Sequence, residues 1–538
     1  TIGGAISITT RKPDEELSGR LSATYGVDNR IDVIGSVNVP WSDSFFSTFS
    51  VGHLSQDGYV KRDDGVDLGD ENTLTGRAAF RWLASEAVEV NFSLEGTRDR
   101  ENGPAFKLIG IDKGPVINRA TGLVDNNTPP MVVIHNQLAS FMAGWPAPGL
   151  GGPDAYPPCV FLPNAIPGVP STTNPAVPTC YDDRYIRRGD HNSGTAPAFS
   201  DNDMWAANFT VDWQINDGLS AKSITAYRKL DADFSRDGDH SPFAISAYLD
   251  HMDLDQLSQE FQLNGDSMDS RLKWVLGLYY FEESGDNENL LDFVMSQFRS
   301  GGAIDNRSWA AFFQGTYDLT DKWHLTAGLR YTDEEKKFRP DQVILLNKFA
   351  GSGHPLLDAP FMQAGERILP YLWKTQTIEE VTPMINLSYD WAEDLMVYGS
   401  YSEGFKSGGF TQRVFPPIVA GFTAPPGTPA IDLIPEFQPE FVKVYELGLK
   451  YATPGRRLRV NGAVFSTKYD DLQVQVFTSV APVTKNAASA TINGFELEMQ
   501  AVPADGWFAE AAVGYLDAEY DDLDTLETRL FKNDKFER

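Results

Sequence analysis

The chain has 538 residues, a formal net charge of −30 and only two cysteines. Hydrophobic residues make up 41% and aromatic residues 12% of it, which is too much for an acidic chain that stays disordered. The excess of acidic residues argues against nucleic acid as a partner, because a phosphate backbone attracts a basic surface. By length alone, the chain could form about three domains of ~100–200 residues.

Alternation with a period of two dominates the sequence. Apolar and polar side chains alternate over residues 73–82, 88–97, 205–213, 308–317 and 323–332. Each such run predicts a β-strand with one apolar face. No apolar run approaches the ~18 residues that a membrane-spanning helix needs, so a helical membrane protein is excluded. The fold class that we expect is all-β.

Aromatic residues stand near both ends of several apolar faces. The pairs are Trp205 and Trp213, Trp309 and Tyr317, and Trp323 and Tyr331. Transmembrane β-strands carry aromatic belts at the two membrane interfaces, with an apolar band between them. The opposite faces hold Arg, Glu, Asp and Asn, as the wet interior of a barrel would. We therefore expect a transmembrane antiparallel β-barrel.

Short and long connections alternate along the chain. Short polar turns are expected near Pro40–Asp43, Ala84–Ala87, Asn216–Gly218, Asn264–Ser270, Thr320–Lys322, Trp391–Asp394, Thr453–Arg456 and Pro503–Gly506. Long connections are expected at about 100–201, 232–249, 284–304, 333–376 and 405–439. Outer-membrane barrels have tight periplasmic turns and long external loops. The spacing predicts about 17 strands, and because closed bacterial barrels have an even number, we expect an incomplete barrel.

The two cysteines, Cys159 and Cys180, lie in one segment rich in proline and glycine. A disulfide between them would stabilise a modest loop by about 3 kcal/mol in the chain-entropy account. It would also require an oxidising compartment. Two unrelated thiols are the alternative, and the spacing does not indicate a metal site.

Three segments carry a more specific signal than the strand pattern. Residues 1–13 (TIGGAISITTRKP) are similar to the last strand of the plug domain of TonB-dependent outer-membrane receptors, where it leads into the barrel. Residues 401–410 (YSEGFKSGGF) resemble a signature at a strand that leaves for a long external loop, and residues 439–450 resemble the returning strand. The positions that carry the resemblance are Gly3, Gly4, Tyr401, Gly404, Phe405, Lys406, Gly408, Gly409, Phe410, Glu446 and Gly448.

The resemblance implies a barrel of about 22 strands with a plug inside it, in the outer membrane of a Gram-negative bacterium. Residues 1–13 would be the end of the plug and residues 14–538 an incomplete barrel. The resemblance also implies energised import of a scarce nutrient, most often a ferric siderophore. The expected partners are the TonB energiser complex, through an N-terminal box expected outside these residues, outer-membrane lipid and the small-molecule ligand. The chain as given would not transport, whereas the full-length protein would.

Ligand-binding residues are expected in the long external connections. Residues 101–200 hold 15 of the 33 prolines, and a connection of this length is usually functional or disordered. Aromatic side chains could stack on a sugar or catecholate, and arginines could pair with an anionic chelate. The candidates are Trp145, Tyr156, Tyr181, Arg184, Arg187, Tyr371, Trp373, Lys406 and Arg413. The alternative is a loop that packs on itself and covers the barrel mouth.

Motifs of catalysis are absent: the chain has no H-E-x-x-H, C-x-x-C or G-x-S-x-G, and residues 404–409 do not fit a phosphate-binding loop. The acidic segment 63–71 is the best cation candidate, although its spacing is not that of an EF-hand and a solvated loop is the alternative. We therefore expect no enzyme activity, no cofactor and no resident metal.

Uptake of an iron chelate is the function that we prefer. TonB-dependent uptake of a glycan or a cobalamin-like ligand and a passive porin-like channel stay open, because one fold serves many ligands. A secreted all-β hydrolase or adhesin would share the strands but not the paired aromatics.

Overall fold

The computed structural model describes residues 9–110, 117–118, 123–124, 185–187, 189–241, 246–293, 296–348, 350–351, 358, 360–412, 427–455, 457–477 and 482–523. Long strands make up most of this part of the chain. They are β1 (Ser18–Tyr25), β2 (Ile31–Ser42), β3 (Phe45–Gln56), β6 (Glu71–Ser85), β7 (Val88–Glu101), β11 (Phe199–Asn216), β12 (Leu219–Asp237), β13 (Ser246–Ser267), β14 (Leu272–Phe293), β15 (Ser296–Asp318), β16 (Trp323–Pro340), β18 (Lys374–Ala392), β19 (Leu395–Lys406), β22 (Glu440–Ala452), β23 (Leu458–Phe477), β24 (Pro482–Ala501) and β25 (Ala509–Leu523). The short strands are β4 (Val60–Arg62), β5 (Asp67–Leu68), β8 (Ile117–Asn118), β9 (Leu123–Val124), β10 (His191–Asn192), β17 (Val343–Asn347), β20 (Gly409–Phe410) and β21 (Glu436–Phe437).

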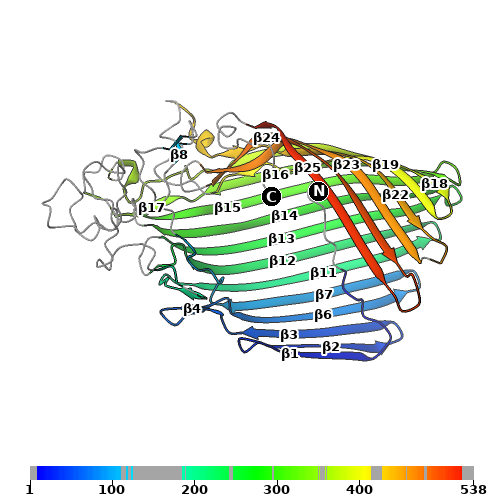
Figure 1. The fold of residues 1–538 in the computed structure, drawn as a ribbon, viewed down its shortest axis with the longest axis horizontal. Helices are drawn as coiled ribbons and strands as arrows, with labels where there is room; N and C mark the ends of the chain where they lie inside the picture. The colour runs from blue at the N-terminus through cyan, green and yellow to red at the C-terminus, as the bar shows by residue number, and fades with distance from the viewer. Residues whose placement is uncertain are drawn as a thin grey trace.

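One sheet of 18 strands holds all the long strands and the short β17 within the described residues. Each long strand pairs antiparallel with the next long strand, from β1 with β2 to β24 with β25. Without β17, the sheet has 17 long strands, as the spacing of the turns predicts. Figure 1 shows the sheet curving round, so that β22–β25 cross the view in front of the middle strands. The expected antiparallel barrel architecture is confirmed.

The two ends of the sheet differ in their connections. Tight turns gather at the right-hand end of Figure 1, whereas the short strands β4 and β17, which belong to the longer connections, lie at the left-hand end. The β11–β12 turn is typical of the tight end, because Asn216 Oδ1 accepts a hydrogen bond from the Gly218 N–H (3.0 Å). Short turns also lie where they were expected between β15 and β16 and between β18 and β19.

The outer face of the sheet is an apolar band. Leu276 and Leu278 of β14 and Phe313 of β15 lie in the middle of this face, yet they are 47%, 56% and 45% exposed. Such a large exposed apolar surface suits hydrocarbon and not water. Trp205 and Trp213 border the band on β11, eight residues apart, or about 26 Å at ~3.3 Å per residue. On a strand tilted by ~40°, this length spans about 20 Å of the ~25 Å height of the apolar band of outer-membrane barrels.

Aromatic side chains pair between strands at both borders of the band. Trp205 packs on Tyr227 with ring centroids 4.9 Å apart, and Trp309 packs on Tyr331 at 5.3 Å. At the border near the tight turns, Trp323 packs on Tyr389 at 4.5 Å. The aromatic belts that the sequence predicts are confirmed.

Small and polar side chains line the inner face. Ala206 and Ala310 are 3% and 1% exposed there. Near the tight turns, the segment before β1 lies against the same face. Lys12 Nζ is 2.6 Å from Glu89 Oε1, and Arg81 donates a hydrogen bond to the carbonyl of Pro13 (3.4 Å).

The predictions of long connections at 232–249 and 284–304 are wrong in extent, because strands occupy most of these residues. β12 continues to Asp237 and β13 begins at Ser246, and β14 and β15 are separated only by residues 294–295. The strands continue because each residue finds a ladder partner on the neighbouring strand. A buried cluster also packs against their extracellular ends. Its members are Leu291, Phe298, Ile344, Met362, Ile368 and Leu369.

The connections expected at 333–376 and 405–439 also contain regular structure. β16 continues to Pro340, β17 follows, and β20 and β21 pair with each other. Within the described residues, η2 (Pro360–Met362) and η3 (Ala430–Leu433) are short 3-10 turns. No helix in this part of the chain is long and apolar enough to cross a membrane.

Candidate functional site

The glycine-rich signature begins on β19, whose successive residues face opposite sides of the wall. Tyr401 lies on the outer face, where it packs on Tyr445 of β22 with ring centroids 5.0 Å apart. Tyr398 lies on the inner face and donates a hydrogen bond to Glu446 Oε1 (2.6 Å). Lys406 ends β19 at an even position, and therefore faces inward like Tyr398.

Other signature positions serve close packing. A Cβ at Gly448 would lie 2.5 Å from the hydroxyl oxygen of Tyr398, so glycine leaves room for this ring. A Cβ at Gly409 would lie 2.9 Å from the ring of Phe437. Only glycine lets β20 approach β21 this closely. Gly404 and Phe405 are ladder positions on β19.

A cavity of about 600 Å³ lies beside the turn that follows β19. Its lining comes from strands far apart in the sequence. Lining residues include Glu283, Lys336, Phe338, Lys406, Phe437 and Gln473. Pockets of roughly 300–1,000 Å³ hold small ligands. The cavity combines positive charge, amide groups and aromatic rings at the extracellular end of the inner face.

Hydrogen bonds hold the turn beside this cavity. Lys336 Nζ donates to the carbonyl of Gly408 (3.0 Å), and Gln473 Nε2 donates to the carbonyl of Ser407 (3.0 Å). The hydroxyl of Ser407 donates to Glu334. Lys406, by contrast, has no ion pair with another described residue. Its ammonium group is available to a ligand.

Arg187 lies beside a small sheet at the extracellular mouth. In this sheet β10 pairs in parallel with β4. Arg187 Nη2 lies 3.0 Å from Asp63 Oδ2, which also accepts a hydrogen bond from Ser193 Oγ (2.8 Å). Arg62 is 6% exposed and pairs with Asp64 at 2.5 Å. Two carboxylates of the acidic segment 63–71 are thus engaged by arginines.

Two buried carboxyl groups organise the connection between β12 and β13. Asp237 Oδ2 accepts hydrogen bonds from the N–H groups of Thr195 and Ala196 (2.9 and 3.0 Å). Burial, together with the charge of Asp237, raises the pKa of Asp239 to about 7. Burial lowers the pKa of His240. The Asp237 carboxylate therefore ties the end of β12 to the segment that follows β10.

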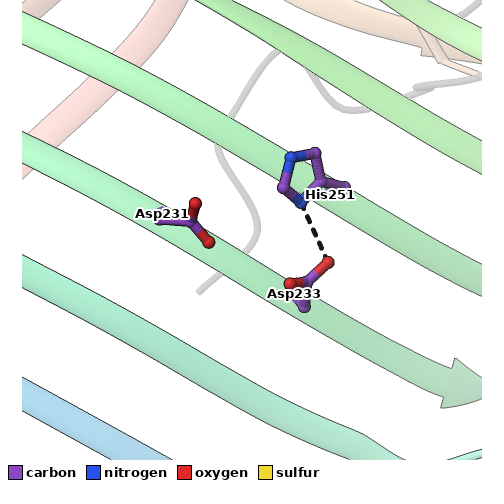
Figure 2. Close-up of side chains that lie close together, drawn as sticks. All are labelled: Asp231, Asp233 and His251. Atoms are coloured by element: carbon purple, nitrogen blue, oxygen red, sulfur yellow. Dashed lines mark hydrogen bonds and ion pairs between the residues drawn. The ribbon is translucent and has the colours of Figure 1, made fainter.

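Asp231 and Asp233 of β12 and His251 of β13 lie together on the outer face (Figure 2). One ligand atom of each lies within 4.8 Å of the others, and His251 Nδ1 is 2.9 Å from Asp233 Oδ1. Two carboxylates and an imidazole could hold a divalent cation with water as the remaining ligands. The group faces away from the cavity beside β19.

The structure separates the ligand candidates of the sequence. Lys406 lies at the inner cavity and Arg187 at the mouth, whereas Tyr371 and Trp373 contact Arg339 on the outer side of the wall. The remaining candidates and the cysteines lie outside the described residues. They are Gly3, Gly4, Trp145, Tyr156, Cys159, Cys180, Tyr181, Arg184 and Arg413.

Sequence reasoning missed Lys336 and Gln473. Alternation on β16 could have indicated Lys336, because Leu329 and Tyr331 set the odd positions on the outer face and the even positions on the inner one. Gln473 follows an irregularity in the β23–β24 pairing, so the pattern of β23 does not predict its side.

Residues 161–535 match the family described as "TonB dependent receptor-like, beta-barrel". The chain belongs to the TonB-dependent receptor family. Like its family, this TonB-dependent receptor is a β-barrel of the Gram-negative outer membrane. This result confirms the resemblance that the two barrel segments carry.

Known proteins similar to this TonB-dependent receptor include the pesticin receptor of Yersinia pestis, 25% identical over 234 residues. That match covers 43% of this chain and 29% of the pesticin receptor. The ferric yersiniabactin uptake receptor FyuA from Yersinia pestis has a TM-score of 0.65 at 15% identity, over 96% of this chain and 63% of that one. The closed form of the ferric-catecholate import receptor Fiu from E. coli K12 has a TM-score of 0.60 at 13% identity, over 95% and 66%. The chain therefore spans less than two thirds of the first of these relatives, and the structural likeness shows the fold alone.

Proposed function

We propose that the protein containing this chain imports an iron chelate of the siderophore type across the outer membrane, driven by the TonB complex. Membership in the receptor family supports import and coupling to TonB. FyuA and Fiu are a ferric yersiniabactin uptake receptor and a ferric-catecholate import receptor by their titles. The proposed activity is binding and passage, without covalent chemistry and without a resident cofactor.

The observation that carries the proposal is the inner cavity at the end of β19. Lys406 has no ion pair there with a described residue, and Lys336 lies in the same lining. The stacked rings of Phe338 and Phe410, with centroids 5.8 Å apart, add an apolar surface. A ferric chelate with anionic oxygens and an aromatic group fits this combination, because an ammonium group forms charge-assisted hydrogen bonds with such oxygens.

We further propose that residues 1–13 are the end of the plug and residues 14–538 the barrel. The ion pair of Lys12 with Glu89 (2.6 Å) supports this division. So does the hydrogen bond from Arg81 to the carbonyl of Pro13. A plug that enters the barrel from the side of the tight turns would need such an attachment to the inner face.

Uptake of labelled ferric chelates by cells with the full-length receptor tests the proposal. We expect uptake of a catecholate, phenolate or hydroxamate complex to require TonB. Lys406→Gln should weaken binding roughly 10- to 150-fold, because a charge-assisted hydrogen bond contributes roughly 1.5–3 kcal/mol. Lys443→Gln is the matched control, since Lys443 lies on the outer face of the adjacent strand and pairs with Asp470 (3.6 Å).

Two outcomes would overturn the proposal. Uptake that continues without TonB would favour a passive channel. TonB-dependent uptake of a glycan or of a cobalamin-like ligand, with no uptake of any ferric chelate, would keep the coupling and change the ligand.

A further inference from the structure

Arginines and aromatic rings gather on the outer side of the wall at its extracellular end. We call Arg299, Arg339, Arg367, Tyr371 and Trp373 the arginine–aromatic cluster. The guanidinium carbons of Arg339 and Arg367 each lie 4.5 Å from the centre of the Tyr371 ring. Arg339 also lies 5.0 Å from the centre of the Trp373 ring. Stacking on these rings holds the guanidinium groups in place.

Alternation along two strands shows which side the cluster occupies. On β16, Phe338 is 1% exposed and stacks on Phe410 beside the inner cavity, so the next residue, Arg339, faces outward. On β15, Phe298 is 2% exposed within the inward-facing buried cluster, so Arg299 faces outward as well. The arginine–aromatic cluster and the inner cavity thus lie on opposite sides of one sheet.

The charge of the cluster is only partly neutralised. Asp341 lies 3.1 Å from Arg299 and 2.9 Å from Arg367, and Glu288 lies 3.8 Å from Arg299. Three cations against two anions leave one positive charge, on a chain whose net charge is −30. Arg339 has no ion pair with any described residue. Tyr371 and Trp373 are each 43% exposed, so their rings are accessible.

The cluster lies well outside the apolar band. Tyr331 belongs to the outer aromatic belt, and Arg339 follows it by eight residues on the same strand, about 26 Å away at ~3.3 Å per residue. A surface at this level lies beyond the acyl chains, in the aqueous layer into which the sugars of outer-leaflet glycolipid extend. A solute inside the barrel meets the other face of the sheet.

We propose that the arginine–aromatic cluster binds a phosphorylated sugar of the glycolipid in the outer leaflet. This function is separate from import through the barrel. Planar guanidinium groups pair with phosphate or carboxylate through two parallel hydrogen bonds. An exposed aromatic ring packs against the apolar face of a sugar. Because Tyr371 already orients Arg339 and Arg367, binding costs less side-chain entropy than it would with free arginines.

Binding of purified lipopolysaccharide with a phosphorylated core to the full-length receptor in neutral detergent tests the proposal. We expect the Arg339→Gln/Arg367→Gln double variant to bind at least tenfold more weakly than the unchanged protein. Removing the core phosphates should weaken binding to the unchanged protein by a similar factor. The matched control is Arg307→Gln, since Arg307 also lies on the outer face and pairs with Glu282 and Asp305, both at 3.7 Å.

Heat-modifiable migration on a gel shows whether each variant is folded. Arg339→Lys/Arg367→Lys is the second variant, which keeps the charge but loses the planar fork, and we expect it to bind with intermediate affinity. Unchanged affinity of the Gln double variant would overturn the proposal. An equal loss in Arg307→Gln, or equal binding of dephosphorylated lipopolysaccharide, would overturn it too. So would a loss of ferric-chelate uptake with glycolipid binding intact, because the cluster would then serve the cargo.

Discussion

Gly408 allows the chain to pass close to Phe437 after β19 ends. A Cβ at this position would lie 2.5 Å from the carbonyl oxygen of Phe437 and 2.7 Å from Gln376 Oε1. We expect Gly408→Ala to lower the free energy of unfolding by about 1–3 kcal/mol, the usual cost of overpacking. The unfolding transition in detergent measures this. Gly514→Ala is the control, because a Cβ there meets no described residue within 4 Å, and an equal loss in both variants would contradict the role of Gly408.

Asp239 makes the connection between β12 and β13 sensitive to pH. Its pKa is raised to about 7 by burial and by Asp237, against ~3.9 in an unfolded chain. The folded protein binds this proton more tightly, so its contribution to stability is fully present below about pH 4 and is lost as pH rises through 7. We expect amide exchange at Ser241 and Ser246, whose N–H groups donate to Asp239, to exceed the intrinsic increase between pH 6.5 and 8.5.

Asp239→Asn should remove this extra pH dependence in the same hydrogen-exchange experiment. His240 does not interfere, because burial lowers its pKa and it stays mostly neutral in this range. An unchanged slope in Asp239→Asn would assign the effect to another group.

At the scale of elements, the β14–β15 hairpin extends beyond the outer aromatic belt as a paired ladder. Phe298, which is 2% exposed, packs there in the buried cluster with Leu291 and Ile344. We expect Phe298→Ala to destabilise this extension by roughly 3–5 kcal/mol. Limited proteolysis with mass spectrometry should show new cuts near the hairpin tip and an intact transmembrane part. Phe313→Ala, on the lipid-facing side, should add no cuts there, and unchanged resistance of Phe298→Ala would contradict the role of the cluster.

The sequence did not indicate this extension for a physical reason. Above the membrane, the outer positions of β14 meet water and are occupied by Ser284, Asp286 and Glu288. Polar residues on both faces remove the alternation from which a strand is predicted. The segment therefore looked like a loop, although its ladder continues to Phe293.

At the scale of the whole molecule, the apolar outer band requires a lipid environment. Leu278 lies in the middle of this band and is 56% exposed. We expect Leu278→Arg in the full-length protein to cost roughly 2–4 kcal/mol, the cost of a cation at the bilayer midplane. The temperature at which the folded, fast-migrating gel band is lost should fall. Gln314→Arg, on the inner face of the neighbouring strand, should leave this temperature nearly unchanged, and an equal fall would contradict the assignment of faces.

The sequence by itself determined the antiparallel strands that form the barrel wall and the two faces of that wall. Hydrocarbon on one side and water on the other impose a period of two, and membrane interfaces favour aromatics such as Trp205 and Trp213 at both ends of a strand. Tight turns then follow from the geometry of neighbouring antiparallel strands. These are local constraints, so they can be read along the chain without knowledge of distant contacts.

Only the tertiary structure decided which side of the wall each candidate occupies. Tyr371 and Lys406 were grouped as ligand candidates by their chemistry, yet the sheet separates them, one outward and one inward. The alternation of inward and outward side chains cannot be counted through an irregular connection such as residues 341–373. One extra residue there would turn every later side chain to the opposite face of the sheet. The inner cavity likewise exists only because the curved sheet brings Lys336, Lys406 and Gln473 together.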